Sequence, residues 1–246
     1  RNNDRWLFIS SNDSDSLYLM GVKYIWQIPL QRENKYFSSL ERTDRAKGRV
    51  DYIYNGSIYP IFLEDIDNDG KMDLLCKLID FFTAKPRGLI LYDFETGSIK
   101  WRYDLPCNPR SVLWDDFDGN GSKEIIISND ALKNTDEIIN DVDDSSGWII
   151  VLSTKGEVLY KEREFNGYGK ICLDTADVNQ DGIKEIYAVN CTWGSEKHFN
   201  IASVFNWNGK RLIKNRTLEL PSTLESKQYA HFLQKMGSTS DYYLHL

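Results

Sequence analysis

The sequence has few of the residues that usually carry catalysis or bind zinc. Its 246 residues include only three histidines and four cysteines. The histidines, His198, His231 and His245, lack the spacing of a metal site or a catalytic triad, and no C-x-x-C pair is present. The nucleophile elbow and the H-E-x-x-H, P-loop and G-x-G-x-x-G motifs are also missing. We therefore expect a protein that is not an enzyme.

Long hydrophobic runs are missing too. The apolar stretch at 148–152 has the length of a strand, well short of the roughly 18 residues of a membrane span. A net charge of −7 argues against nucleic acid as a partner, because phosphate binding needs clustered lysine and arginine. A hydrophobic content of 41% with 27% charged residues is that of a globular protein. The chain begins with Arg1 rather than methionine, so we expect it to be part of a longer chain.

An acidic motif occurs three times, at 65–74, 116–125 and 177–186. Each copy has aspartate or an amide at positions 1, 3 and 5, glycine at position 6 and an acid at position 9. Alternate residues of a tight loop can direct their oxygens at one centre, and Ca²⁺ is bound by six to eight oxygens. Carboxylates this close together repel one another unless a cation lies among them. The motif therefore predicts about three calcium ions, with a plain polar turn as the alternative.

The predicted calcium ligands are the side chains at positions 1, 3, 5 and 9 and the position-7 residue, which offers its backbone carbonyl. They are Asp65, Asp67, Asp69, Lys71 and Asp73 in the first copy, Asp116, Asp118, Asn120, Ser122 and Glu124 in the second, and Asp177, Asn179, Asp181, Ile183 and Glu185 in the third. An EF-hand is excluded because position 12 is Cys76, Ile127 or Ala188 instead of glutamate, and because the flanking residues alternate like strands.

A second pattern lies between the acidic motifs: an apolar strand, a turn containing glycine, and a strand that includes an aromatic or apolar residue. Its copies lie at 17–26, 89–101, 149–160 and 203–213. Glycine after a polar residue between two such runs is a hairpin signal. Together the two patterns predict a four-stranded antiparallel module of about 50–60 residues, which is the size of a β-propeller blade. In the middle copy the strands are expected at 111–115, 124–128, 147–152 and 157–163.

The fold class expected is therefore all-β, a β-propeller domain or propeller fragment that takes in residues 1–246. Residues 31–50 are expected to form a long exposed loop. The tail 218–246 is expected to contain a helix at about 223–236, because Ser222 and Glu225 form a capping box. Residues 241–246 could be one more strand, which either closes a four-bladed ring or belongs to a larger ring. The blade parts are 1–30, which is partial or split, and the three full blades 57–105, 110–164 and 169–217.

The cysteines and tryptophans give weaker signals. Cys172 and Cys191 flank the third acidic loop and could pair across neighbouring strands, although buried free thiols are favoured. Trp101 occupies a hairpin position that suits core packing. Trp148 and Trp193 lie near loop ends and are candidates for ligand contact.

The D-x-[DN]-x-[DN]-G-x-x-[DE]-[IL] loops between strands resemble those of FG-GAP or VCBS repeats, which occur in integrin α-subunit propellers and bacterial surface proteins. The resemblance covers about residues 1–217. The hairpin around Thr96-Gly97 that ends at Trp101 is similar to that of quinoprotein-type propellers. The FG-GAP phrases themselves are absent, and the blade number is below the usual seven of the family. The resemblance implies a calcium-stabilised propeller whose loops bind ligands on one face.

These observations favour a non-enzymatic module for ligand recognition, adhesion or sensing, with a protein or carbohydrate as the partner on the loop face. Calcium loops of this kind often have affinities suited to extracellular calcium, so we expect an extracytoplasmic location: periplasmic, cell-surface or secreted. The alternatives are the propeller part of a polysaccharide lyase or hydrolase, and a structural spacer domain.

Overall fold

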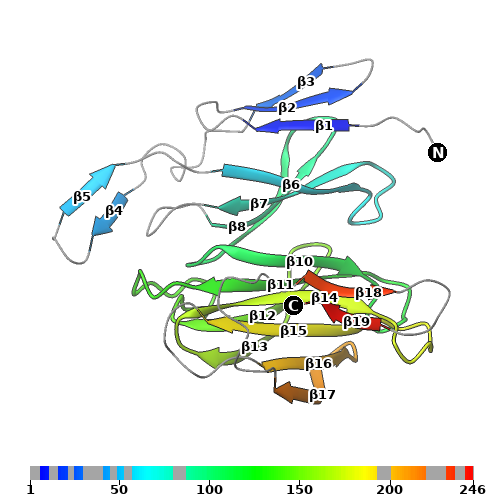
Figure 1. Ribbon diagram of the computed structural model, residues 1–246. Coiled ribbons are helices and arrows are strands. Elements are labelled where there is room, and N and C mark those ends of the chain that lie inside the picture. The colour runs from blue at the N-terminus through cyan, green and yellow to red at the C-terminus, as the bar shows by residue number, and fades with distance from the viewer. Residues whose placement is uncertain are drawn as a thin grey trace. The chain divides into compact units, whose positions relative to one another are not determined.

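In the computed structural model of the chain, every regular element among the described residues is a β-strand (Figure 1). The described residues are 6–10, 16–21, 25–29, 41–44, 49–52, 57–79, 87–192, 201–219, 231–235 and 242–245. Two compact units divide the chain, Arg1–Pro109 with Asn134–Val142 and Arg110–Lys133 with Asp143–Leu246. The all-β prediction is confirmed for the described part, and the extent of a single propeller domain stays a prediction.

The first unit contains a four-stranded antiparallel sheet that we call the first module. Its strands β6 (Ser57–Glu64), β7 (Asp73–Ile79), β8 (Gly88–Asp93) and β9 (Ile99–Asp104) are paired in sequence order. The two central strands are apolar runs with side chains buried on both faces, whereas β9, at the edge, is mostly half-buried. A short, mostly apolar run is typical of a strand that is buried on both faces.

Two smaller sheets precede the first module in the chain. Strands β1 (Trp6–Ser10), β2 (Ser16–Gly21) and β3 (Ile25–Pro29) form one, and β4 (Glu41–Asp44) pairs with β5 (Arg49–Tyr52) in the other. The predicted loop over 31–50 is therefore wrong at residues 41–44 and 49–50. The register explains the hairpin, because two of the four residue pairs across these strands join opposite charges and a third joins two β-branched residues.

The second unit contains two more four-stranded modules. The second module consists of β10 (Pro109–Asp115), β11 (Glu124–Ala131), β12 (Ser146–Ser153) and β13 (Val158–Asn166). These strands confirm the four predicted for the middle repeat, with each end shifted by no more than a few residues. The burial pattern again shows two buried central strands, β11 and β12, beside a more exposed edge strand, β13.

The third module follows directly after β13. Its strands are β14 (Gly169–Ala176), β15 (Glu185–Thr192), β16 (Ile201–Trp207) and β17 (Leu212–Glu219), paired in sequence order. Strand β14 also pairs with the end of β11, so the second and third modules form one eight-stranded sheet (Figure 1). Their shared core contains Phe117, Ile126, Ile149, Val151, Phe165, Ile171 and Phe205.

A buried carboxylate fastens the second module to the third. The Glu164 side chain, on β13, is only 3% exposed and pairs with the ammonium of Lys214 on β17 at 2.8 Å. The same carboxylate accepts hydrogen bonds from the Ser203 hydroxyl at 2.9 Å and the Asn190 amide at 3.5 Å. Three strands of one module therefore meet a single charged side chain of its neighbour.

The predicted C-terminal helix is wrong over residues 231–235. These residues form strand β18 (His231–Lys235), which pairs with β19 (Tyr242–His245), and the remainder of the predicted helix lies outside the described residues. The aromatic and apolar residues of β19 provide a partner strand, and such tertiary pairing overrides a weak helical pattern. The strand predicted at 241–246 is confirmed for its described residues.

The cysteines and tryptophans settle two smaller predictions. Cys172 is a buried thiol, which is the state that the sequence favours over a disulfide, and the register places it opposite Val189 rather than Cys191. Trp148 is 9% exposed, with the Arg163 guanidinium 4.8 Å from its ring centroid, which leaves little surface for a ligand. Trp101 is half-buried, and Trp193 lies outside the described residues. A search of the described residues finds no helix with the length and apolar character needed to cross a membrane.

Candidate metal-binding loops

The three acidic motifs fold into the same hydrogen-bonded loop. We call residues 65–73 loop one, 116–124 loop two and 177–185 loop three. The aspartate at position 1 of each, Asp65, Asp116 or Asp177, accepts hydrogen bonds from the backbone N–H groups at positions 5 and 6, at 2.8–3.1 Å. The position-1 side chain therefore holds the turn. Because it makes the same two bonds in all three loops, aspartate begins each motif.

Glycine at position 6 is needed for conformation rather than for space. Gly70, Gly121 and Gly182 have φ of 86°, 88° and 89°, and a Cβ at any of them would meet no atom within 4 Å. The residue at position 4 of each loop also has positive φ, between 60° and 72°. Two left-handed residues in one loop produce the sharp reversal that brings alternate side chains to one side.

The acid at position 9 anchors each loop to the strand that follows it. Asp73, Glu124 and Glu185 are the first residues of β7, β11 and β15, and each accepts a hydrogen bond from the backbone N–H at position 2, at 3.1, 3.2 and 2.9 Å. All three are buried, with Asp73 fully so. Each loop therefore has an ionisable group beneath it, away from water, where an unpaired charge is costly.

Positions 5 and 7 complete the turn. In each loop the position-5 side chain accepts the backbone N–H of the position-7 residue, at 2.7–2.9 Å. The pairs are Asp69 with Lys71, Asn120 with Ser122, and Asp181 with Ile183.

Carboxylate clusters form in two of the three loops. In each cluster, three oxygens lie within 4.8 Å of one another, a spacing that suits a cation bound at 2.3–2.6 Å from each. The clusters are Asp65, Asp67 and Asp73 in loop one, and Asp116, Asp118 and Glu124 in loop two. The residues present thus fit a hard divalent cation at these two places.

Loop three uses an amide where the other loops have a carboxylate. The Asn179 amide nitrogen donates to Glu185 Oε1 at 2.6 Å, and its oxygen accepts the backbone N–H of Asp181 at 2.9 Å. A neutral donor therefore contacts the buried acid directly. The predicted ligands Asp177, Asn179, Asp181 and Glu185 share one loop, but the third calcium ion stays a prediction.

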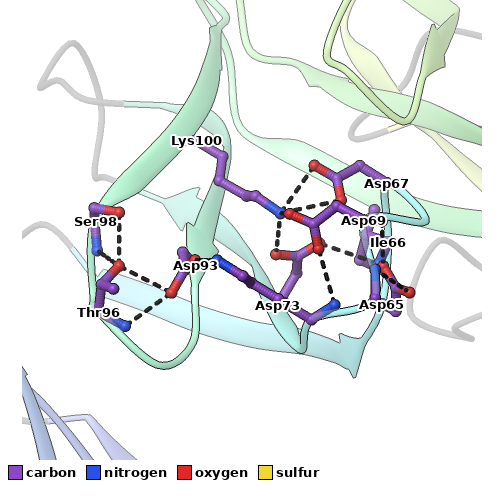
Figure 2. A network of polar contacts seen from close by, with 11 residues as sticks. Asp65, Ile66, Asp67, Asp69, Asp73, Asp93, Thr96, Ser98 and Lys100 are labelled. Atoms are coloured by element: carbon purple, nitrogen blue, oxygen red, sulfur yellow. Dashed lines mark hydrogen bonds and ion pairs between the residues drawn. The ribbon is translucent and has the colours of Figure 1, made fainter.

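Loop one contains a cation of its own, which the sequence analysis missed. The ammonium of Lys100, on β9, lies 2.8 Å from both Asp69 and Asp73 and 2.9 Å from Asp67 (Figure 2). Burial alone would lower the pKa of Lys100, but its bonds to the three carboxylates outweigh burial and raise it. The pKa of Asp69 is lowered, mainly by its hydrogen bond to Lys100, whereas burial raises the pKa of Asp73 in spite of that lysine.

The turn before β9 positions Lys100. Asp93 accepts hydrogen bonds from the backbone N–H of Thr96 at 2.8 Å and from its hydroxyl at 2.9 Å (Figure 2). These two bonds lower the pKa of Asp93. Because the turn is closed by an ionised side chain, the start of β9 is fixed beside loop one. A lysine between two apolar residues of a hairpin strand is the only sequence signal that this contact leaves.

Loop two has no such cation. Among the described residues, no lysine or arginine forms an ion pair with Asp116, Asp118 or Glu124, and the neighbouring Lys123 instead lies 3.6 Å from the ring centroid of Trp114. Burial raises the pKa of Glu124 to about 7; the hydrogen bond from the Phe117 N–H opposes this rise, and the charges of Asp118 and Asp116 add to it. The uncompensated charge of this cluster is what a bound cation would neutralise.

The fold is similar to that of rhamnogalacturonan lyases. Bacillus licheniformis rhamnogalacturonan lyase PL11 matches with a TM-score of 0.53 at 15% identity, over 93% of this chain and 47% of that one. The exotype rhamnogalacturonan lyase YesX matches with a TM-score of 0.52 at 14% identity, over 94% of this chain and 46% of that one. Rhamnogalacturonan lyase YesW matches with a TM-score of 0.55 at 13% identity, over 96% of this chain and 49% of that one.

The likeness is one of fold. The chain spans about half the length of the solved structures it matches, and the identities of 13–15% carry no shared activity by themselves. No protein-family model matches the sequence, and no curated protein is significantly similar to it. The chain is thus all-β and propeller-like, in the manner of these lyases.

Proposed function

We propose that this chain is the propeller part of a polysaccharide lyase or hydrolase. The observation that carries the proposal is the fold similarity to three rhamnogalacturonan lyases, which extends over 93–96% of the chain. In this proposal the chain, which spans about half the length of each of those structures, carries a polysaccharide site of its own. Such a site takes an acidic polysaccharide as its partner.

Calcium has a structural role in this proposal. Loop two lies at the start of β11, and its three carboxylates are close together with no partner cation among the described residues. A bound Ca²⁺ neutralises that charge and holds the loop in one conformation. Since loops of this kind often bind calcium in the extracellular range, the proposal includes an extracytoplasmic location.

A non-enzymatic recognition module is the second candidate. It is supported by the sequence, in which no catalytic motif is present and the three histidines lack a catalytic spacing. In this candidate the loops bind a carbohydrate or protein ligand without transforming it. The two candidates share the fold and the calcium loops, and for a polysaccharide ligand they differ in whether the bound polysaccharide is cleaved.

A single set of measurements separates them. The chain is mixed with rhamnogalacturonan in calcium-containing buffer, binding is followed by calorimetry, and cleavage is followed by the ultraviolet absorbance of the unsaturated product that a lyase leaves and by the release of reducing ends. Dextran is the neutral control. Binding to rhamnogalacturonan but not to dextran, with or without cleavage, supports the polysaccharide partner. Absence of binding to the acidic polysaccharide contradicts the proposal.

A further inference from the structure

The ammonium of Lys100 neutralises carboxylates of loop one, as a bound metal ion would. A lysine ammonium has three N–H donors, and here three carboxylates lie within 2.8–3.0 Å of the nitrogen. The lysine side chain is 17% exposed and reaches a fully buried partner, Asp73. Figure 2 shows the nitrogen joined by dashed lines to the carboxylates of Asp67, Asp69 and Asp73. The nitrogen therefore stands where a metal bound to these carboxylates would be placed.

A β-bulge puts Lys100 in that position. Leu91 pairs with Trp101 and Tyr92 pairs with Ile99, so Lys100 is an extra residue without a partner in the ladder. A bulge turns one additional side chain out of the regular alternation and often redirects it toward a site. The lysine is thereby aimed at the loop without changing the pairing of its neighbours.

The same bulge occurs in the second module but carries a different residue. There Val151 pairs with Tyr160 and Leu152 pairs with Val158, which leaves Leu159 as the extra residue. Leu159 is apolar and 43% exposed, so it brings no charge to loop two. In the third module the register shift leaves Asn215, a neutral amide. Of the three bulge residues, Lys100 alone is cationic.

Two cations cannot share loop one. A divalent ion bound by Asp67 and Asp73 would lie within contact distance of the Lys100 nitrogen, where like charges repel strongly and the ion pairs of the lysine would have to break. Loop two meets no such obstacle among the described residues. We infer that Lys100 is the resident cation of loop one, and that calcium binds at loop two but not at loop one. This inference rests on the calcium binding proposed above and refines it.

Calcium counting on the unaltered protein and three variants tests the inference. The whole chain is dialysed against Ca²⁺, and the bound metal is measured by atomic absorption for the unaltered protein and for Asp67→Asn, Asp118→Asn and Lys100→Met. We expect Asp67→Asn to bind as many ions as the unaltered protein, Asp118→Asn to bind one fewer, and Lys100→Met to bind one more. The NMR signal of the Lys100 ammonium should also be unchanged by calcium.

The failures are distinguishable. Loss of one ion in Asp67→Asn, or a calcium-induced change at the Lys100 ammonium, overturns the inference and leaves calcium binding intact. If neither the unaltered protein nor Asp118→Asn binds calcium, the calcium part of the proposed function fails, while a gained ion in Lys100→Met still supports the role of the lysine in loop one. If Lys100→Met does not fold, Asp67→Asn and the ammonium signal decide, because both keep the lysine.

Discussion

Loop one and loop two share a backbone and differ in what neutralises them. In both, the position-1 aspartate holds the turn and the position-9 acid anchors it to a strand, with matching hydrogen bonds. In loop one a lysine from another strand contacts three carboxylates, whereas in the described part of the chain no lysine or arginine forms an ion pair with the three clustered carboxylates of loop two. The comparison teaches that the motif encodes the shape of the loop, and that a residue outside the motif decides its charge.

The largest expected effect comes from removing the lysine. In calcium-free buffer, Lys100→Met should lower the free energy of unfolding by about 3 kcal/mol, because a buried partner, Asp73, loses its cation. Urea unfolding followed by circular dichroism measures the loss. Lys100→Arg, which keeps the charge, is the control and should lose much less. Equal stability of Lys100→Met and the unaltered protein would show that the ion pairs contribute nothing.

Calcium removal should have the next largest effect and should act on the second unit. At a calcium concentration 100-fold above Kd, binding contributes about 2.7 kcal/mol, so a chelator should lower the melting temperature by about 5–10 °C. Scanning calorimetry measures the change in melting temperature, and hydrogen exchange shows which loop is destabilised. We expect faster exchange in loop two and little change in loop one; the reverse pattern would contradict the difference between the loops.

Grafting the lysine into the second module tests the comparison in the opposite direction. Leu159→Lys places an ammonium at the bulge equivalent to that of Lys100. In chelator this variant should be more stable than the unaltered protein by about 0.5–1 kcal/mol, because the charge cluster of loop two gains a partner at a partly exposed site. Its melting temperature should also respond less to calcium. Leu159→Gln is the neutral control, and an equal response of both variants would remove the charge explanation.

A pH dependence of the calcium-free protein is also expected, spread over the interval between two pKa values of one carboxyl group. The folded-state pKa of Glu124 is about 7, above its ordinary value of 4.5, so the folded state holds this proton after the unfolded state has lost it. The contribution of this group therefore stabilises the fold below pH 4.5 and is lost as the pH rises to about 7. Urea unfolding in chelator between these pH values should show a shallower slope for Glu124→Gln; an unchanged slope would assign the dependence to other groups.

Much of this arrangement could be predicted from the sequence. The turn-forming positions of the three loops and the four strands of the middle repeat follow from local rules, in which aspartate, glycine and alternating apolar residues have fixed places. The role of Lys100 could not be predicted, because it lies 27 residues beyond Asp73 and depends on a bulge in the register. The strands β4 and β18 were missed for a different reason, since the conformation of each is decided by pairing with the strand that follows it, β5 or β19, and not by its own residue pattern.

The fastening at Glu164 has a consequence for how such repeats can be exchanged. Its carboxylate belongs to one repeat, but the lysine, serine and asparagine that satisfy it belong to the next. A copy of the second repeat moved by gene duplication to another position would carry a stranded negative charge unless its new neighbour supplied the same three groups. The repeats therefore share one strand arrangement, but the side-chain contacts between neighbouring repeats fix their order along the chain.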